Sequence, residues 1–269
     1  MNRKAVAGVV ILLWVAGFLW MLRRNSGGDV NRRLTEAALH VQPASFYYTL
    51  FYRGNRIGAA SSAIDTLPAA LVAEEFYTGS FPSGDCLIPV TARLRSGLTR
   101  AFRLTNISLE MARSGIVSKS SAFVQADTTL IVTDRVSADS AASHIFALHS
   151  ALLAPALVPV AFMLGEDAKV GRRERFVVFN PVDRKPEAHE FRIGRDSLFT
   201  VVDSASHSAD SSWRTAHSDT VRAWLIGGET AGVTAWVDRE GRIVEASTAG
   251  GLLLRRTAYE LAFERARRK

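Results

Sequence analysis

The stretch that decides the fold is Ser45–Asp65, which reads SFYYTLFYRGNRIGAASSAID. Its first part is rich in aromatic residues, which is typical of an extended strand. Gly54-Asn55 then supplies a turn, and Arg56–Asp65 follows as the returning strand. The stretch therefore predicts an antiparallel β-hairpin.

The same pattern of short strands and turns continues through most of the chain. Between Thr105 and Asn106 the alternation of apolar residues slips by one position, which predicts a β-bulge. Asp238–Gly241 predicts a tight hairpin turn. Strands joined by turns in this way favour an antiparallel sheet. The further expected strands are Glu75–Pro82, Leu87–Arg95, Ala101–Met111, Ile116–Phe123, Thr128–Thr133, Glu174–Asn180, His189–Ile193, Ser197–Val202, Thr220–Ile226, Gly232–Val237, Arg242–Ser247 and Leu252–Arg256.

Two segments predict helices. His144–Leu164 is strongly apolar, and Pro155 and Pro159 would kink it. We expect a buried helix that covers the sheet, with a membrane re-entry as the alternative. Thr257-x-x-Glu260 has the spelling of a capping box and predicts a C-terminal helix. The expected fold class is mainly β (α+β), a curved antiparallel sheet or half barrel packed on a central helix.

The front of the chain predicts a membrane anchor. Ala5–Leu22 is apolar and uncharged, and at about 1.5 Å per residue it would span about 27 Å, close to a bilayer's hydrocarbon core. A cleaved secretory signal is the alternative, but Ala16-Gly17 is the only small pair and Phe18 follows it. The fold class therefore includes one N-terminal transmembrane helix.

These segments give the expected organisation of the chain. Residues 1–24 would form a cytoplasmic tip and the anchor, and residues 25–45 a linker with a short helix, Val30–His40. That helix would lie on lipid headgroups or act as a stalk. Residues 46–269 would form a β-rich extracytoplasmic domain. A short N-terminal tail before the anchor favours an inner-membrane protein of a bacterium, with its bulk in the periplasm.

Four stretches of the chain resemble motifs of a bacterial envelope family. They are YTLFYRGNRIG from Tyr48, FVVFNPVD from Phe176, TAWVDREGRIVEAS from Thr234 and LLLRRTAYELA from Leu252. The chain is similar to extracytoplasmic half-barrel domains of LolA-like type, which also precede the catalytic part of some transglutaminase-like proteins. The resemblance implies a curved sheet around a helix and, at most, binding of an apolar ligand. The catalytic Cys, His and Asp of the transglutaminase part have no counterpart here.

Composition disfavours several classes of function. The net charge of +7 is compatible with nucleic acid, but an anchor and scattered basic residues favour anionic lipid or an acidic partner instead. Cys86 is the single cysteine, which excludes an intramolecular disulfide and predicts a small buried apolar side chain. Nucleotide-binding and serine-hydrolase motifs are absent from the sequence. Glu74-Glu75 are neighbours, so on a strand they would face opposite ways, and we expect exposed charges.

The histidines give no strong site. His207, Asp210, His217 and Asp219 fall in a Ser- and Asp-rich stretch, Asp203–Ser218, which predicts an exposed loop. Their spacing is not that of a metal site, so we expect no metal there.

His144 and His149 flank the apolar segment and are expected at its edge rather than as a catalytic pair. No catalytic residue and no cofactor site is predicted.

Two functions remain, and an enzyme ranks below both. In the first, the chain is a structural or accessory subunit that docks on an integral-membrane complex, for example one of respiratory or photosynthetic antenna–reaction-centre type, and does not bind nucleic acid. In the second, it is a binding module for a lipid or other apolar ligand. Membrane or partner contacts are predicted at Trp14, Gly17, Trp20, Arg23, Arg24, Arg32 and Arg33. The apolar cavity is predicted at Leu152, Leu153, Leu157 and Phe162.

Overall fold

The structure is a computed structural model that describes residues 34–36, 41–84, 86–137, 140–164, 167–208, 212–228 and 232–263. The expected anchor, Ala5–Leu22, lies outside these residues. So do all the predicted membrane and partner contacts, which are Trp14, Gly17, Trp20, Arg23, Arg24, Arg32 and Arg33. Among the described residues, none of the helices has the length and apolar character needed to cross a membrane.

One sheet of fifteen strands makes up nearly all of the described chain. The strands are β1 (Ala44–Tyr52), β2 (Asn55–Thr66), β3 (Ala70–Ser83), β4 (Cys86–Thr99), β5 (Leu104–Arg113), β6 (Ile116–Gln125), β7 (Thr129–Ser137), β8 (Ser140–Ala147), β9 (Leu152–Leu153), β10 (Arg173–Asn180), β11 (Lys185–His207), β12 (Trp213–Gly228), β13 (Val233–Asp238), β14 (Ile243–Thr248) and β15 (Leu252–Thr257). The helices are η1 (Pro155–Leu157), α2 (Val158–Leu164) and α3 (Tyr259–Ala262).

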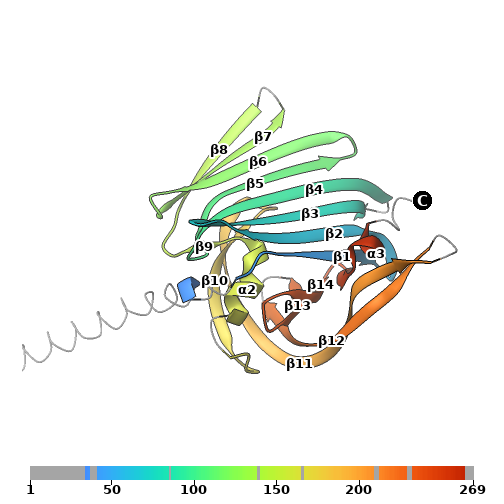
Figure 1. Cartoon of the computed structure of the whole chain (residues 1–269). Helices are drawn as coiled ribbons and strands as arrows, with labels where there is room; N and C mark the ends of the chain where they lie inside the picture. Colours follow the sequence, from blue (N-terminus) through green and yellow to red (C-terminus); the bar gives the residue numbers. More distant parts are fainter. Residues whose placement is uncertain are drawn as a thin grey trace, which may run out of the picture.

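The sheet consists of two meanders joined along one seam. Strands β1 to β8 follow each other in order, as do β9 to β15, and β1 pairs with β15 to join the two series. All pairs are antiparallel except β9 with β10. The sheet curves strongly, with α2 inside the curve (Figure 1). Arg184, in the β10–β11 turn, contacts Asp134 of β7 at 2.9 Å, so strands near opposite ends of the sheet meet across the curve.

The hairpin signal and the bulge signal are both confirmed. Strands β1 and β2 are joined at Arg53-Gly54, where both residues have positive φ. In the pairing of β4 with β5, Gly97 pairs with Asn106 and Leu98 with Leu104, which leaves Thr105 as the extra residue. The Thr105 hydroxyl donates to the Gly97 carbonyl at 2.8 Å and fixes the bulge.

The main core fills the curve of the sheet. Buried residues of α2 and η1, such as Phe162 and Leu157, pack against Leu71 and Leu98 of one meander and Phe176 of the other. Phe162 and Phe176 meet edge to face, with 6.3 Å between ring centroids. The two meanders are therefore tied together through the short helical segment.

The expected α+β class with a long central helix is wrong, whereas the curved antiparallel sheet is as expected. The predicted transmembrane helix lies outside the described residues. The part of the chain that the structure describes is one large curved sheet, antiparallel but for one pair, and its helices, such as η1, α2 and α3, are short. The segment predicted as a helix, His144–Leu164, begins instead in β8, because its residues alternate across the strand: Ile145 is 71% exposed and Phe146 packs on the core. Pro155 lies in the first turn of η1, where the missing N–H is tolerated, so helix begins only there.

The predicted capping box is also wrong. Thr257 is the last residue of β15 and pairs with Tyr47. Ala258 takes the cap position of α3 without a side-chain hydrogen bond. Further forward, residues 34–36 form a helical turn, and Leu34 is buried in the core at 3% exposure. This turn therefore packs against the protein core. The two roles expected for Val30–His40, a helix on lipid headgroups or a stalk, did not include such packing.

Candidate functional site

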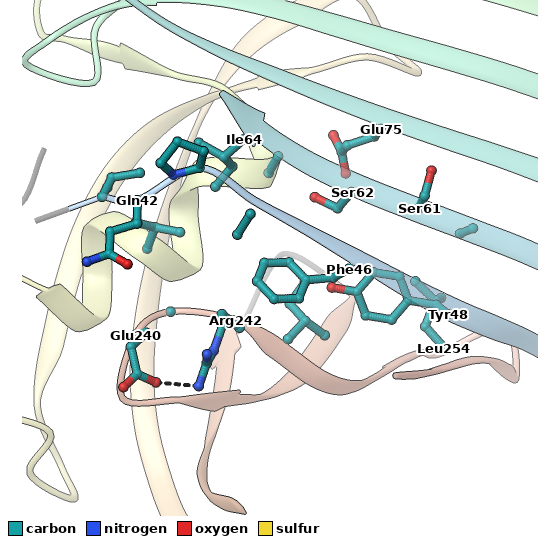
Figure 2. A pocket seen from close by; sticks show the side chains of 18 of the residues that line it. Gln42, Phe46, Tyr48, Ser61, Ser62, Ile64, Glu75, Glu240, Arg242 and Leu254 are labelled. Atoms are coloured by element: carbon teal, nitrogen blue, oxygen red, sulfur yellow. Dashed lines mark hydrogen bonds and ion pairs between the residues drawn. The ribbon is translucent and has the colours of Figure 1, made fainter. Parts of the chain in front are cut away.

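Polar side chains gather on the inner face of β1, β2 and β3. Residues opposite each other in an antiparallel pair point to the same face. Ser62 pairs with Glu75, Ala60 pairs with Tyr77, and Tyr48 pairs with Ala60. These five residues therefore share one face, and they line a cavity within the curve of the sheet (Figure 2).

The cavity has a volume of about 440 Å³, within the range of about 300–1,000 Å³ that small-ligand sites occupy. Its floor is the inner face of the three strands, and its walls come from η1, α2, the β13–β14 turn and the segment before β1. The apolar lining consists of Val41, Pro43, Ala44, Phe46, Ala60, Ile64, Ala156, Val160, Leu164, Gly241, Ile243 and Leu254. The polar lining consists of Gln42, Tyr48, Ser61, Ser62, Glu75, Tyr77, Glu240 and Arg242.

Glu75 is the acidic group at the inner end of this cavity. It is half-buried, and its Oε1 accepts a hydrogen bond of 2.9 Å from the Tyr77 hydroxyl. Burial raises the pKa of Glu75 above its usual value, and the bond from Tyr77 partly offsets that rise. In turn the Glu75 charge, together with burial, raises the pKa of Tyr77 well above its usual range. The neutral Tyr77 hydroxyl thus donates to the Glu75 carboxylate and fixes its position, and the carboxylate remains a hydrogen-bond acceptor.

Tyr48 offers an unused hydrogen-bonding group beside this pair. The residue is 4% exposed, and its hydroxyl has no hydrogen-bond partner among the described residues. Burial raises the pKa of Tyr48 far above its usual value, so the phenol stays neutral. The hydroxyl points toward Phe46 and the cavity (Figure 2). Because the hydroxyl faces the cavity, it offers one donor and an acceptor to a ligand atom or a water.

The β13–β14 turn forms the opposite wall and is locked from within. Asp238 is 1% exposed; its Oδ1 accepts from the Glu240 and Arg242 amides at 3.1 and 2.9 Å, and its Oδ2 accepts from Arg242 Nε at 2.6 Å. Arg256 of β15 adds a contact of 3.3 Å to Oδ2. These bonds confirm the predicted tight turn at Asp238–Gly241. They also hold Arg242 at the cavity rim, where it pairs with Glu240 (Figure 2). The distance from Arg242 Nη2 to Glu240 Oε2 is 2.6 Å.

The four residues predicted to line an apolar cavity lie deeper than the cavity surface. Leu153, Leu157 and Phe162 are at most 1% exposed and belong to the packed core. Leu152, 2% exposed, borders a separate small pocket beside His149. The same segment reaches the main cavity through other residues, Ala156, Val160 and Leu164 in the lining given above.

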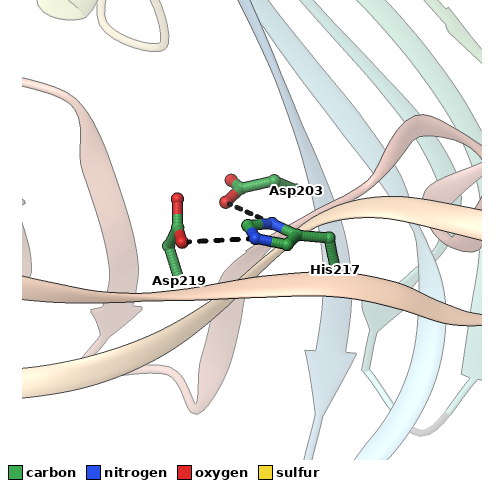
Figure 3. Close-up of side chains that lie close together, drawn as sticks. All are labelled: Asp203, His217 and Asp219. Atoms are coloured by element: carbon green, nitrogen blue, oxygen red, sulfur yellow. Dashed lines mark ion pairs between the residues drawn. The ribbon is translucent and has the colours of Figure 1, made fainter.

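A second polar cluster lies on the long hairpin of β11 and β12 (Figure 3). His217 Nδ1 is 3.9 Å from Asp203 Oδ2, and His217 Nε2 is 3.6 Å from Asp219 Oδ1. Asp203 is the extra residue of a bulge, since Val202 pairs with Ser218 and Ser204 with His217. One ligand atom from each residue lies within 4.8 Å of the others. The three residues could thus reach a common ion, but all of them are exposed, and exposed acidic groups commonly lie this close without one.

The prediction that Asp203–Ser218 forms a loop is wrong. The described parts are the ends of β11 and β12, because the two strands continue to pair as far as His207 with Trp213. The exposure is nevertheless as expected, with His217 and Asp219 side chains 63% and 64% exposed. Asp210 lies outside the described residues.

Three other candidate residues lie at the surface. Cys86 is exposed, contrary to the expected buried position, because it begins β4 next to a hairpin turn and pairs with Ser83. His144 and His149 are exposed at β8 and after it.

Comparison with known proteins gives a fold but no family. Neither the protein-family models nor the curated proteins produced a match. Among solved structures, a β-barrel-like protein of domain of unknown function DUF1849 from Brucella abortus is similar, with a TM-score of 0.51 at 8% identity over 80% of this chain and 95% of that one. A DUF1089 family protein from Pseudomonas aeruginosa aligns at TM-score 0.38 and 12% identity over 71% and 90%.

The first likeness supports the half-barrel part of the resemblance stated from the sequence. At 8% identity it shows the fold alone. Nothing in these comparisons supports a LolA-like identity, an association with transglutaminase-like proteins, or an anchor. The half-barrel fold is therefore the firm result, and the cavity inside it is the feature that bears on function.

Glu75 is the residue of the cavity that sequence reasoning missed. The prediction that Glu74 and Glu75 face opposite ways is correct. Glu74 pairs with Arg93 at 3.3 Å on the outer face, whereas Glu75 points inward and not to solvent. The signal was available, because Leu71 and Ala73 precede Glu75 at alternate positions and are both buried. An acidic residue at an inward position of a strand is a candidate binding group.

Proposed function

We propose that this chain is a binding protein that holds an amphipathic ligand, a molecule with an apolar chain and a polar head, in the cavity between α2 and β1–β3. The observation that carries the proposal is a ligand-sized cavity with a mostly apolar wall and a few convergent polar groups. Tyr48 and Glu75 supply hydrogen-bonding capacity that the described protein leaves unused.

Binding without catalysis fits the residue types that line this cavity. The described lining contains no histidine, lysine or cysteine. Its one inward acidic group, Glu75, is held by Tyr77 and has no second titratable group of matched pKa beside it. A general acid–base pair is recognised by two groups whose environments push their pKa values apart around neutrality, which this arrangement lacks. Docking on an integral-membrane complex stays a prediction from the sequence.

The test is the binding of an apolar fluorescent probe, N-phenyl-1-naphthylamine, to the full chain. Ser62 lies on the cavity floor, so Ser62→Trp places an indole in the space that the ligand would take. Ser121→Trp is the matched control, because Ser121 is an exposed position of β6. We expect the wild type and Ser121→Trp to bind the probe with equal Kd, and Ser62→Trp to bind at least about tenfold more weakly.

Equal binding by all three proteins would show that the probe binds elsewhere and would contradict the proposal. A thermal unfolding curve for each variant separates loss of the cavity from loss of the fold. A Ser62→Trp protein that unfolds cooperatively near the wild-type midpoint and still binds the probe would be decisive against it.

A further inference from the structure

We propose that the cavity selects an amphiphile whose head is a primary ammonium group, with the nitrogen at Glu75 and the alkyl chain along α2. This inference rests on the proposed function and names the chemistry of its ligand. It follows from the balance of charge in the lining, from the count of free acceptors, and from the position of the apolar wall.

The balance of charge leaves one acidic group without a cation. Three charged residues line the cavity, Glu75, Glu240 and Arg242. Arg242 is paired with two other carboxylates, with Nη2 at 2.6 Å from Glu240 and Nε at 2.6 Å from Asp238. Among the described residues, Glu75 is bonded by the neutral Tyr77 hydroxyl and forms no ion pair. A cationic head would supply the missing charge, and a ligand carboxylate would add a second negative charge beside the first.

The free acceptors match the donors of an ammonium group. A primary ammonium carries three N–H donors and no acceptor. The Glu75 carboxylate has one oxygen engaged by Tyr77 and the other free of described partners. The Tyr48 hydroxyl oxygen is unpartnered, and Ser62 lies opposite Glu75 in register on the same face. Glu75, Tyr48 and Ser62 thus offer one acceptor to each of the three hydrogens.

The apolar wall gives the direction of the chain. Figure 2 shows Glu75 and Ser62 on the strand side, and Glu240 and Arg242 across the cavity. Val160 of α2 and Leu254 of β15 belong to the apolar lining already given, and Val160 lies against the turn at Gly241. An alkyl chain attached to a nitrogen at Glu75 would therefore run over carbon atoms and would not meet a second unpaired charge.

The test compares three ligands with the same twelve-carbon chain and different heads, dodecylamine, 1-dodecanol and dodecanoate, by calorimetric titration of the full chain at pH 7 below their critical micelle concentrations. Hydrogen bonds to a charged group are worth about 1.5–3 kcal/mol, which corresponds to about tenfold or more in Kd. We expect dodecylamine to bind at least about tenfold more tightly than 1-dodecanol, and dodecanoate to bind most weakly.

Two variants of neighbouring residues sharpen the comparison. Glu75→Gln removes the inward charge and should reduce the preference for the amine over the alcohol to less than about threefold. Glu74→Gln removes the same charge from the outer face, where Glu74 pairs with Arg93, and should leave the preference intact. Equal effects of the two variants would mean that net charge, not the cavity, sets the preference, and would overturn the inference.

The outcomes separate this inference from the proposed function. If the fluorescent probe binds in the cavity but the three heads bind equally, or dodecanoate binds most tightly, the ammonium inference fails and the binding function stands. If neither the probe nor any of the three ligands binds, both fail.

An ammonium head could belong to a lipid or to a free long-chain amine. Titration with lysophosphatidylethanolamine and lysophosphatidylcholine distinguishes these two sources. The ethanolamine head keeps three N–H donors, and the choline head has none. Preference for the ethanolamine lipid indicates a lipid source, and binding of dodecylamine with neither lipid indicates a free long-chain amine.

Discussion

Two polar clusters of this protein combine carboxylates with ring side chains, and they differ in what surrounds them. Glu75, Tyr77 and Tyr48 lie on the inner face of the sheet, where Tyr48 is 4% exposed and burial raises the pKa of Glu75. Asp203 and His217 belong to the long hairpin, with side chains 37% and 63% exposed. Water and salt screen the second cluster, whereas the cavity isolates the first.

The difference shows that residue type alone does not identify a site. The hairpin cluster carries the residues that metal and acid–base sites use, and its sequence attracts attention for that reason. The inner cluster reads in sequence as ordinary strand residues. Enclosure gives the inner cluster unused hydrogen-bonding capacity at a place where a small molecule fits. The predictions below test that contrast.

The largest effect is expected where the cavity wall meets α2. Gly241 has φ +81°, and a Cβ there would lie 2.4 Å from the Val160 Cα. Gly241→Ala should therefore lower the free energy of unfolding by about 3 kcal/mol or more and weaken probe binding in the cavity. The measurement is urea unfolding, with the probe titration at native conditions.

Gly115→Ala is the control for the backbone angle alone. Gly115 has a similar φ of +83° and open space around its Cα. It should cost about 1 kcal/mol and leave probe binding unchanged. Equal costs at the two glycines would show that the turn does not press on α2, and the inner cluster would then lack its stated wall.

An intermediate effect is expected from the inward charge itself. Because burial raises the pKa of Glu75 above its usual value of 4.5, the folded protein binds more protons than the unfolded chain between the unfolded and folded pKa values. Stability is therefore lost as pH rises through this window, and the loss is complete above the folded pKa. Glu75→Gln should raise the free energy of unfolding by about 1 kcal/mol at pH 7, and the gain should vanish below pH 4.5.

Urea unfolding between pH 4 and pH 8 measures this dependence. Glu74→Gln is the partner variant, and it should lack the pH-dependent gain, because Glu74 pairs with Arg93 at the surface. A Glu75→Gln protein less stable than wild type at pH 7 would mean that the carboxylate is already compensated.

The smallest effect is expected at the hairpin. His217→Ala should change the free energy of unfolding by less than about 0.5 kcal/mol, because its contacts with Asp203 and Asp219 are 3.9 and 3.6 Å long and exposed. Zinc chloride at micromolar concentration should leave the thermal midpoint of the full chain unchanged within error. A rise in the midpoint that His217→Ala abolishes would make the hairpin a metal site and reverse the contrast.

The sequence predicts the sheet well because its signals are local. The turn at Gly54, the bulge at Thr105 and the turn at Asp238 each depend on residues that are neighbours in the chain. Successive side chains of a strand point to opposite faces. Glu74 accordingly lies on the outer face and Glu75 on the inner face. These features need no knowledge of distant segments.

The sequence fails where distant segments decide the outcome. The apolar run His144–Leu164 has no strong period, and its first part becomes β8 because β7 is available to pair with it. The stretch from Asp203 has a loop composition, and pairing between the two arms of the hairpin overrides it. The cavity depends on the approach of α2, β15 and the β13–β14 turn to β1–β3, which no single stretch encodes.

The central claim is that the half barrel holds an amphiphile by its head at Glu75. The most direct measurement is a crystal structure of the full chain grown with dodecylamine. The account predicts an alkyl chain beside Val160, with its nitrogen within about 3 Å of the Glu75 carboxylate and of the Tyr48 hydroxyl. A cavity that holds only water, or a nitrogen placed at the rim beside Glu240 with the chain directed away from Glu75, would contradict it.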